Sequence, residues 1–177
     1  VLVEHGKIIE VGLFKDLRNS NPTAEIEYID IDSVLLPGFI DCHTHACFAG
    51  SRAFDFAERN NGSSYLEIAR KGGGIWDTVQ KTRSADAIFL KNKTEKHLKR
   101  FLQNGVTTCE IKSGYGLSVE HEIKLLEVIN SLETELNIVP TCLAAHILPK
   151  DFIGNDYLGH LIENLFQKIK KLTNRID

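Results

Sequence analysis

Apolar and polar residues alternate over positions 1–12 on both sides of His5-Gly6, a pattern that is typical of a β-hairpin. We expect its buried face to consist of apolar residues from both arms (Val1, Val3, Ile8 or Ile9, and Val11). A loop with Asn, Ser and Pro residues at 19–23 leads to a second extended piece at 26–36, which Pro37-Gly38 closes. A β unit of this size is too small to hold a core alone. Residues 1–36 are therefore predicted to be the N-terminal part of a small β domain.

From position 37 onward, short apolar runs alternate with longer helical patterns, which favours repeated strand and helix units around a parallel sheet. The predicted strands are 38–45, 106–112 and 138–146. Three such units in about 110 residues extrapolate to about 250 to 300 residues for eight, the size of a closed (β/α)8 or TIM barrel. Residues 37–177 would then be the first part of an α/β barrel. A doubly wound open sheet uses the same units and stays an alternative.

Three helices are predicted from apolar spacing. The first covers about 86–103, with Asn104-Gly105 as its end and one apolar stripe (Ile88, Phe89, Leu98, Phe101 and Leu102). The second is capped by Ser118, has Glu120 and Glu122 at the positive end of its dipole, and otherwise exposes its charges to solvent. The third runs from Tyr157 to Ile169.

The composition favours an ordinary soluble globular protein, since 42% of the 177 residues are hydrophobic and 25% are charged. A net charge of -3 gives no basic surface for nucleic acid or for an acidic membrane. No apolar run approaches the roughly 20 residues that a membrane helix needs, and no secretory signal opens the chain. The expected partner is a small molecule and the expected location is cytoplasmic, with the four cysteines as free thiols rather than a disulfide framework.

The strongest local feature is the pair His43 and His45, which the predicted first strand carries at its end. Side chains alternate between the faces of a strand, so both imidazoles would point the same way and could share one metal ion. Two satisfied or exposed histidines are the plain alternative, since two ligands do not make a site. Cys47 has the same parity and is a weaker candidate for a third ligand.

Other candidate residues follow the predicted strands. Arg52 could hold a substrate carboxylate with its planar fork, Tyr115 in a glycine-rich loop could donate to a substrate, and His146 could polarise a carbonyl or move a proton. Each also has an ordinary structural interpretation: an exposed arginine, a packed turn tyrosine, a structural histidine. Lys112 is expected to reach solvent. The glycine run 72–74 lacks the residues of a phosphate-binding loop and is predicted to be a flexible loop.

Taken together, five segments resemble the imidazolonepropionases of the amidohydrolase superfamily in order and approximate spacing. They are PGFIDCHTH (37–45), FAGSR (48–52), ARKGGGIWDTVQKTR (69–83), NGVTTCEIKSGYGLS (104–118) and AAHILP (144–149). The HTH motif is shared across the superfamily, whereas the glycine run together with KSGYGL is closer to a signature of this family. The resemblance covers nearly the whole chain.

The resemblance implies a partial TIM barrel of the metallo-dependent hydrolase type and a β-sandwich domain assembled from both chain ends. It implies that His43 and His45 bind one zinc or iron ion, and that Arg52, Tyr115 and His146 contact the substrate, with His146 also catalytic. The implied reaction is hydrolysis of the cyclic amide of 4-imidazolone-5-propanoate to N-formimidoyl-glutamate in histidine degradation. Whether the protein forms a homodimer is left open.

The family takes further metal ligands and a catalytic glutamate from later strands, which this sequence does not contain. Because the chain starts at Val1, lacks methionine and stops in what looks like the start of a further strand, it is interpreted as truncated and inactive alone. Methionines omitted from the sequence are another explanation of their absence. Two other functions remain alternatives: a nucleobase deaminase of the same superfamily, and a non-catalytic metal-binding scaffold.

Overall fold

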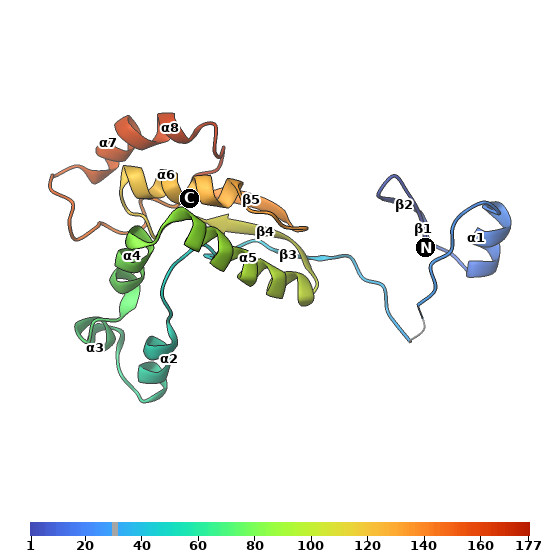
Figure 1. Cartoon of the computed structure of the whole chain (residues 1–177), viewed down its shortest axis with the longest axis horizontal. Coiled ribbons are helices and arrows are strands. Elements are labelled where there is room, and N and C mark those ends of the chain that lie inside the picture. Colours follow the sequence, from blue (N-terminus) through green and yellow to red (C-terminus); the bar gives the residue numbers. More distant parts are fainter. Residues whose placement is uncertain (30–31) are drawn as a thin grey trace. The chain divides into compact units, whose positions relative to one another are not determined.

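The computed structural model describes residues 1–29 and 32–177 and divides the chain into two compact units, Val1–Leu36 and Pro37–Asp177 (Figure 1). Each unit is described by itself. All the candidate site residues belong to the second unit.

The first unit contains the predicted hairpin, formed by β1 (Leu2–Glu4) and β2 (Lys7–Glu10) in antiparallel pairing. His5 and Gly6 have φ values of 49° and 73°, the left-handed pair that a two-residue hairpin turn requires. A short helix, α1 (Phe14–Ser20), follows. The predicted buried face is wrong for this unit, because Val3 is 58% and Ile8 64% exposed. The second extended piece, 26–36, forms no strand in its described part, and residues 30–31 within it lie outside the described residues.

The second unit is built on a parallel sheet in the order β3-β4-β5. Its strands are β3 (Phe39–Asp41), β4 (Val106–Lys112) and β5 (Asn137–Thr141). The expected α/β class is confirmed, and β4 has the predicted bounds. The other two strands are shorter than predicted, since β3 ends four residues before His45 and β5 ends at Thr141. Beyond β5, Cys142 forms a single parallel bridge with Ile176.

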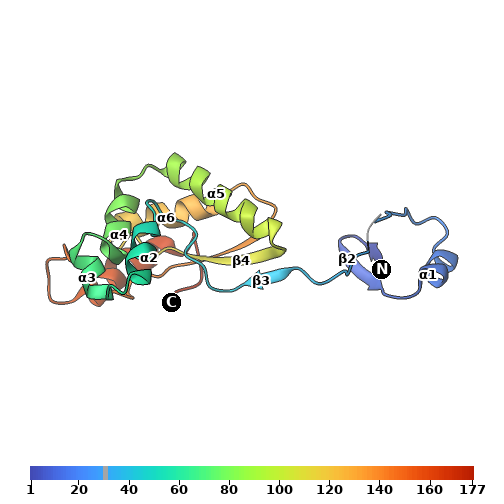
Figure 2. The ribbon, with the colours of Figure 1, turned by 90° about the horizontal axis from the view of Figure 1, so that it is seen from below.

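Helices connect the strands and follow the last one. Their bounds are α2 (Ala53–Asn60), α3 (Tyr65–Arg70), α4 (Gly74–Ser84), α5 (Ala87–Gln103), α6 (Val119–Asn130), α7 (Tyr157–Leu161), the π-helical turn η1 (Ile162–Phe166) and α8 (Gln167–Ile169). Helices α5 and α6 lie on the same side of the sheet (Figure 2). In the two described ranges, no helix is long and apolar enough to cross a membrane.

Helix α5 has the predicted bounds, and its predicted stripe is right in part, because Leu98 is buried and Phe101 and Leu102 pack against the core. Asp86 caps it by accepting a hydrogen bond from the Phe89 amide at 2.7 Å. The buried stripe is Leu90, Thr94 and Leu98, whereas Phe89 is 50% exposed and Ile88 74% exposed. Thr94 takes part because its hydroxyl donates to the Leu90 carbonyl at 2.7 Å, so its own polar atom is buried with a partner. A stripe predicted from apolar residues alone therefore missed Thr94, the middle residue of the buried stripe.

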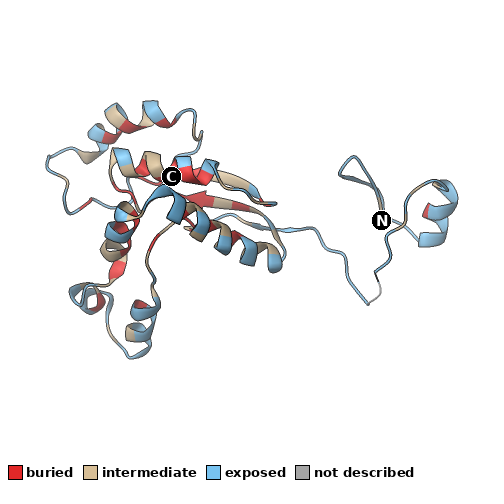
Figure 3. Ribbon diagram, viewed as in Figure 1, coloured by how far each residue is buried: buried red, intermediate tan, exposed pale blue. Residues whose placement is uncertain are grey.

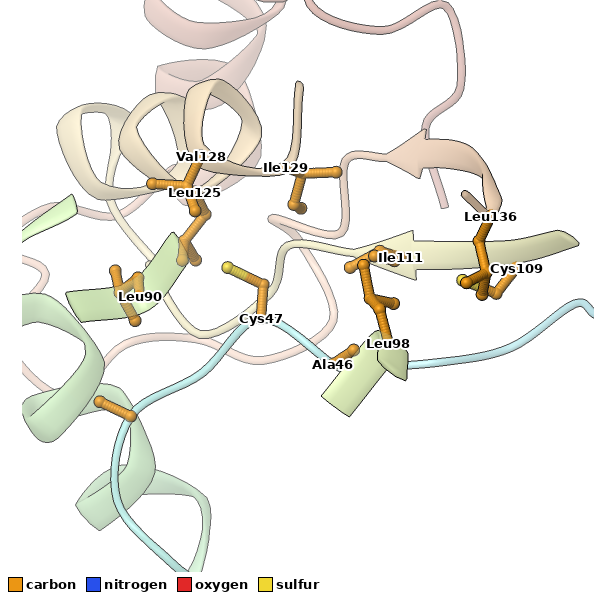
Figure 4. Close-up of a cluster of buried hydrophobic side chains, with 11 residues drawn as sticks. Ala46, Cys47, Leu90, Leu98, Cys109, Ile111, Leu125, Val128, Ile129 and Leu136 are labelled. Atoms are coloured by element: carbon orange, nitrogen blue, oxygen red, sulfur yellow. The ribbon is translucent and has the colours of Figure 1, made fainter. Parts of the chain in front are cut away.

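Helix α6 contributes residues to two buried clusters, and Figure 3 marks buried residues in red. The expected cap is confirmed, because Ser118 Oγ accepts from the His121 amide. One side joins the core between helices and sheet, which Figure 4 shows, with eleven buried members (Ala46, Cys47, Ala49, Leu90, Leu98, Cys109, Ile111, Leu125, Val128, Ile129 and Leu136). The other side carries Leu126 into a second cluster with Leu161, Leu165 and Ile169 of the C-terminal helices. Each fully buried leucine contributes about 1.5 to 3 kcal/mol of apolar transfer.

Candidate functional site

The candidate residues gather where the three parallel strands end. Because β3, β4 and β5 run in the same direction, their carboxyl ends meet at one edge of the sheet. His45 follows β3, Tyr115 follows β4 and His146 follows β5. This is the edge at which parallel α/β folds place ligands.

The segment that carries His43 and His45 stays attached to β4 although it lies beyond β3. The Lys112 amide donates to the Thr44 carbonyl at 2.9 Å, and Thr44 Oγ1 donates to the Glu110 carbonyl at 2.5 Å. Thr44 is buried, so its two neighbours project together to the other side of the extended backbone. The centroids of the two imidazole rings are 5.4 Å apart.

His45 is the more enclosed member of the pair. Its Nδ1 is buried and has no hydrogen-bond partner among the described residues. Burial lowers the pKa of His45, and the nearby charges of His43, His146 and Lys112 lower it further, against a smaller opposite influence of Glu110. The neutral ring is therefore favoured, and neutral imidazole is the form that binds metals.

The spacing of the two rings fits a shared metal ion. With a metal–nitrogen distance of about 2.1 Å and a tetrahedral angle, two imidazole centroids lie about 5 Å apart, close to the observed separation. The unpartnered Nδ1 of His45 is consistent with the same use. Among residues 1–29 and 32–177, however, no group of three His, Cys, Asp or Glu side chains is placed to hold a metal. The chain thus provides two neighbouring ligands rather than a complete set.

Cys47 does not supply the third ligand. Its side chain is fully buried in the core under α5 and α6, where Figure 4 shows it among apolar side chains. Burial raises the pKa of its thiol to about 11, so the metal-binding thiolate is disfavoured. The free-thiol expectation holds for all four cysteines, although Cys42 is exposed rather than packed in a strand.

Arg52 is held by Asp55 and Thr78, and Asp55 is in turn held by the glycine run 72–74. Its Nε lies 2.8 Å from Asp55 Oδ2 and its Nη1 donates to Thr78 Oγ1 at 3.1 Å. The same Asp55 oxygen accepts the Gly74 amide at 3.0 Å. A Cβ on Gly73 would lie 2.4 Å from Asp55 Oδ1, so only glycine permits this approach. The glycine run is a loop only in part, because Gly72 and Gly73 lie between α3 and α4 whereas Gly74 is buried and begins α4.

Tyr115 is half-buried between other rings of the site. Its ring centroid lies 5.6 Å from that of His45 and 6.0 Å from that of Phe48. Burial raises the pKa of Tyr115, while the positive charge of Arg52 acts in the opposite direction. The phenol therefore keeps its proton at neutral pH, and Arg52 is close enough to influence it.

His146 is exposed, and its Nδ1 lies 3.1 Å from the Leu143 carbonyl oxygen. A carbonyl only accepts, so Nδ1 carries a proton and Nε2 is directed elsewhere. The charge of His146 influences His45, which places both residues in one electrostatic neighbourhood. The structure thus brings all five candidate residues to the same edge of the sheet.

A buried ion cluster at this edge was not predicted. Lys112, expected to reach solvent, is 4% exposed, and its Nζ lies 3.0 Å from Glu110 Oε2 and 2.6 Å from Asp177 Oδ2. Burial alone would raise the pKa of Glu110, but hydrogen bonds from Thr141 and Lys112, with the Lys112 charge, outweigh it and lower the pKa. The sequence contains only a weak sign of this cluster. Glu110 and Lys112 carry opposite charges and lie two residues apart on one strand, so their side chains share a face.

Two further polar residues have partners that the sequence analysis did not identify. Glu122 is fully buried beside the Tyr115 loop. The Nδ1 atom of His97 lies 3.0 Å from the Ala46 carbonyl oxygen, and the His97 ring stacks on Phe48 with the ring centroids 5.4 Å apart. It therefore braces the segment that follows the histidine pair.

Comparison with known proteins gives a consistent result. No family model matches the sequence. The imidazolonepropionase of Yersinia enterocolitica is 42% identical over 181 residues, which cover 99% of this chain and 44% of that protein. Those of Bdellovibrio bacteriovorus and Idiomarina loihiensis are 42% and 46% identical, over 100% and 93% of this chain and 43% and 41% of their own lengths. The resemblance drawn from the five motifs is confirmed, and the chain spans less than half the length of these curated relatives.

Proposed function

We propose that this chain carries part of the active site of an imidazolonepropionase, and that the chain matches the amino-terminal part of such an enzyme. The proposed reaction is the metal-dependent hydrolysis of the cyclic amide of 4-imidazolone-5-propanoate to N-formimidoyl-L-glutamate, a step of histidine degradation. The observation that carries the proposal is the 42–46% identity to imidazolonepropionases over 93–100% of the chain. A small soluble metabolite as substrate also makes the cytoplasm the natural location.

The second unit is proposed to be the first part of a (β/α)8 barrel, and the first unit to be part of a composite β-sandwich. The distribution of side chains on the two faces of β4 supports the barrel proposal. Cys109 and Ile111 pack on the helix side of the sheet, whereas Glu110 and Lys112, of opposite parity, project to the other side. Helices α5 and α6 both cover the first side (Figure 2). A doubly wound sheet would have helices on both faces, while a barrel turns its second face inward.

His43 and His45 are proposed to hold one zinc or iron ion, as the separation of their rings and the unpartnered Nδ1 support. When bound, such an ion would supply hydroxide at neutral pH, because it lowers the pKa of a bound water from 15.7 towards about 7. Two ligands hold an ion weakly, so further ligands must come from outside the described residues.

Arg52 is proposed to bind the propanoate tail. Its Nε and one hydrogen of Nη1 are used by Asp55 and Thr78, which leaves the remaining hydrogens of Nη1 and Nη2 as a fork. This fork matches the two oxygens of a carboxylate. Asp55 therefore orients the guanidinium without occupying the end that would meet the substrate.

Tyr115 and His146 are proposed to act at the ring. The protonated phenol of Tyr115 can donate to a ring nitrogen or carbonyl and so orient it. His146 uses its Nδ1 proton for the Leu143 carbonyl, so its Nε2 can donate to a developing oxyanion only when the ring is an imidazolium. Its proposed catalytic role thus requires the second proton on Nε2.

The test is turnover by the complete gene product that contains this chain. Loss of ultraviolet absorbance from 4-imidazolone-5-propanoate would be followed for the wild type, for His45→Gln and for the control His160→Gln, an exposed histidine on α7. We expect activity in the wild type and the control, and at least a 100-fold loss in His45→Gln. Turnover of guanine or cytosine without turnover of imidazolonepropanoate would overturn the proposal in favour of a deaminase.

A further inference from the structure

We propose that Glu122 is a positioning residue for Tyr115, and that its carboxylate and the Arg83 guanidinium together clamp the Tyr115 loop, residues 113–118. The inference rests on the proposed function, since it takes Tyr115 as the residue that meets the substrate. It concerns two side chains to which the proposed reaction assigns no task.

Glu122 lies in the first turn of α6 and binds the amide groups of the loop. Its Oε2 accepts from the Gly114 amide at 3.0 Å, and its Oε1 accepts from the amides of Gly116 and Leu117 at 2.8 and 2.7 Å. The Ser113 hydroxyl is a further hydrogen-bond partner. The carboxylate is fully buried, so these contacts replace water rather than compete with it.

Arg83, at the end of α4, binds the carbonyl groups of the same loop. Its Nε donates to the Gly116 carbonyl at 2.6 Å and its Nη2 donates to the Leu117 carbonyl at 2.9 Å. Its Nη1 pairs with Asp151. Gly116 and Leu117 thus have their amides bound by the Glu122 carboxyl group from one helix and their carbonyls bound by the Arg83 guanidinium from another.

The backbone of the loop needs such a clamp. Leu117 has a φ of 49° and Gly114 a φ of 90°, both in the left-handed region. For a residue with a side chain this conformation costs about 1 to 2 kcal/mol, so the free loop would favour another shape. Gly116 is also confined, since a Cβ there would lie 2.6 Å from the Glu122 amide nitrogen.

Tyr115 stands between these clamped residues, with Gly114 before it and Gly116 after it. Its backbone direction, and hence the position of its ring beside His45 and Phe48, follows from theirs. A substrate group held by the phenol tolerates little displacement, because an error of about 1 Å costs about 100-fold in rate. Loss of the clamp should therefore reduce catalysis through Tyr115.

Gln is the informative replacement for Glu122 because it keeps the shape and changes the chemistry. All three backbone partners are donors, and both oxygens of Glu122 accept from them. The amide of Gln has one accepting and one donating end, so its NH2 group must face at least one loop amide. Glu122→Gln therefore breaks one side of the clamp without removing volume from the core.

The test is a double-mutant cycle in the complete gene product with 4-imidazolone-5-propanoate as substrate. We expect Glu122→Gln to lower kcat/KM about 100-fold, and Tyr115→Phe with Glu122→Gln to match Tyr115→Phe alone within about twofold. Losses that multiply would overturn the proposal, because they would mean that Glu122 does not act through Tyr115. Glu120→Gln, an exposed carboxylate in the same turn, is the matched control and should behave as wild type.

A second variant keeps the test decisive if Glu122→Gln does not fold. Arg83→Lys retains the charge near Asp151 but loses the fork to the two carbonyls. We expect a loss of about tenfold in kcat/KM that again disappears in the Tyr115→Phe background; a loss that persists there would overturn the proposal.

The proposed function and the clamp fail in different ways. Absence of turnover in the wild type would overturn the proposed function. The clamp itself is tested by amide hydrogen exchange of Gly116 and Leu117, which should be slow in the wild type and at least tenfold faster in Glu122→Gln. Equal exchange in both proteins would overturn the clamp whatever the reaction.

Discussion

Replacing Lys112 by Met tests whether the buried ion cluster stabilises the edge of the sheet that carries the site. Lys112 is 4% exposed, and its Nζ contacts carboxylates of Glu110 and Asp177 at 3.0 and 2.6 Å. Met preserves the buried stem and removes only the charge. Glu110 then keeps its hydrogen bond from Thr141 at 2.6 Å but loses the cation that compensates its charge.

The exposure of the two carboxylates determines how much Lys112→Met lowers the free energy of unfolding. Removing one partner of a fully buried pair costs about 3 to 5 kcal/mol, because the other charge stays buried. The Asp177 side chain is 57% exposed and can be hydrated, whereas that of Glu110 is 16% exposed and cannot be fully hydrated. We therefore expect Lys112→Met to lower the free energy of unfolding by about 2 kcal/mol.

Equilibrium urea unfolding of the purified chain, followed by circular dichroism, measures this change. The matched control is Lys91→Met, since Lys91 pairs with a Glu133 side chain that is 85% exposed. Such surface pairs contribute about 0 to 1 kcal/mol, so the control should stay within about 0.5 kcal/mol of the wild type. If Lys112→Met were equally neutral, the ion cluster would not stabilise the fold and the reasoning would be refuted.

The pH dependence provides a second check. The pKa of Glu110 is lowered from the model-compound value of 4.5, so its ionised form is favoured by folding. That contribution is complete above 4.5 and is lost as the pH falls through the lowered folded-state pKa. The difference in stability between the wild type and Lys112→Met should accordingly shrink below pH 4.5. A difference that grew on acidification would contradict the assignment.

Three other changes test the core and the site. Leu98→Ala should lower the free energy of unfolding by about 2 to 5 kcal/mol in urea, while Leu66→Ala, at a position that is 65% exposed, should change it by less than about 0.5 kcal/mol. Asp55→Asn should raise KM for imidazolonepropanoate about tenfold with little change in kcat, because Arg52 loses an ionic partner that orients it for binding; an unchanged KM would contradict this. His45→Gln should reduce the zinc or iron content of the purified gene product, measured by atomic emission, at least tenfold; wild-type metal content would exclude His45 as a ligand.

Features that depend only on residues close in the sequence could be predicted. Strand β4 has its predicted bounds because Gly105 ends the preceding helix and β-branched residues follow at once. Ser118 caps α6 as expected because a cap depends only on the next three residues. The five candidate residues meet because strand ends of a parallel sheet share an edge, whichever residues lie between them.

Buried polar residues could not be predicted in the same way. Glu122 occupies a position that is typical of an exposed first-turn carboxylate, and its burial depends on loop amides that a helical pattern does not contain. The sequence does contain a usable sign of this burial. A glycine-rich loop, whose amides need hydrogen-bond partners, directly precedes a helix with acidic residues in its first turn. Lys112 is harder, because its partner Asp177 lies 65 residues away in sequence.

The direction of the histidine pair could be predicted even though the strand that was expected to carry it ends early. Side-chain alternation requires only extended backbone, and two hydrogen bonds through Thr44 keep that backbone along β4 after pairing of β3 has ended. Both bonds go to residues 110 and 112, whose own side chains form the buried ion cluster. The two residues that hold this backbone also act on His45, in opposite directions: burial is the main cause that lowers the pKa of His45, the Lys112 charge lowers it further, and the Glu110 charge raises it. The contacts made through Thr44 fix the direction of both imidazoles, and a fixed direction is what the proposed shared metal ion requires.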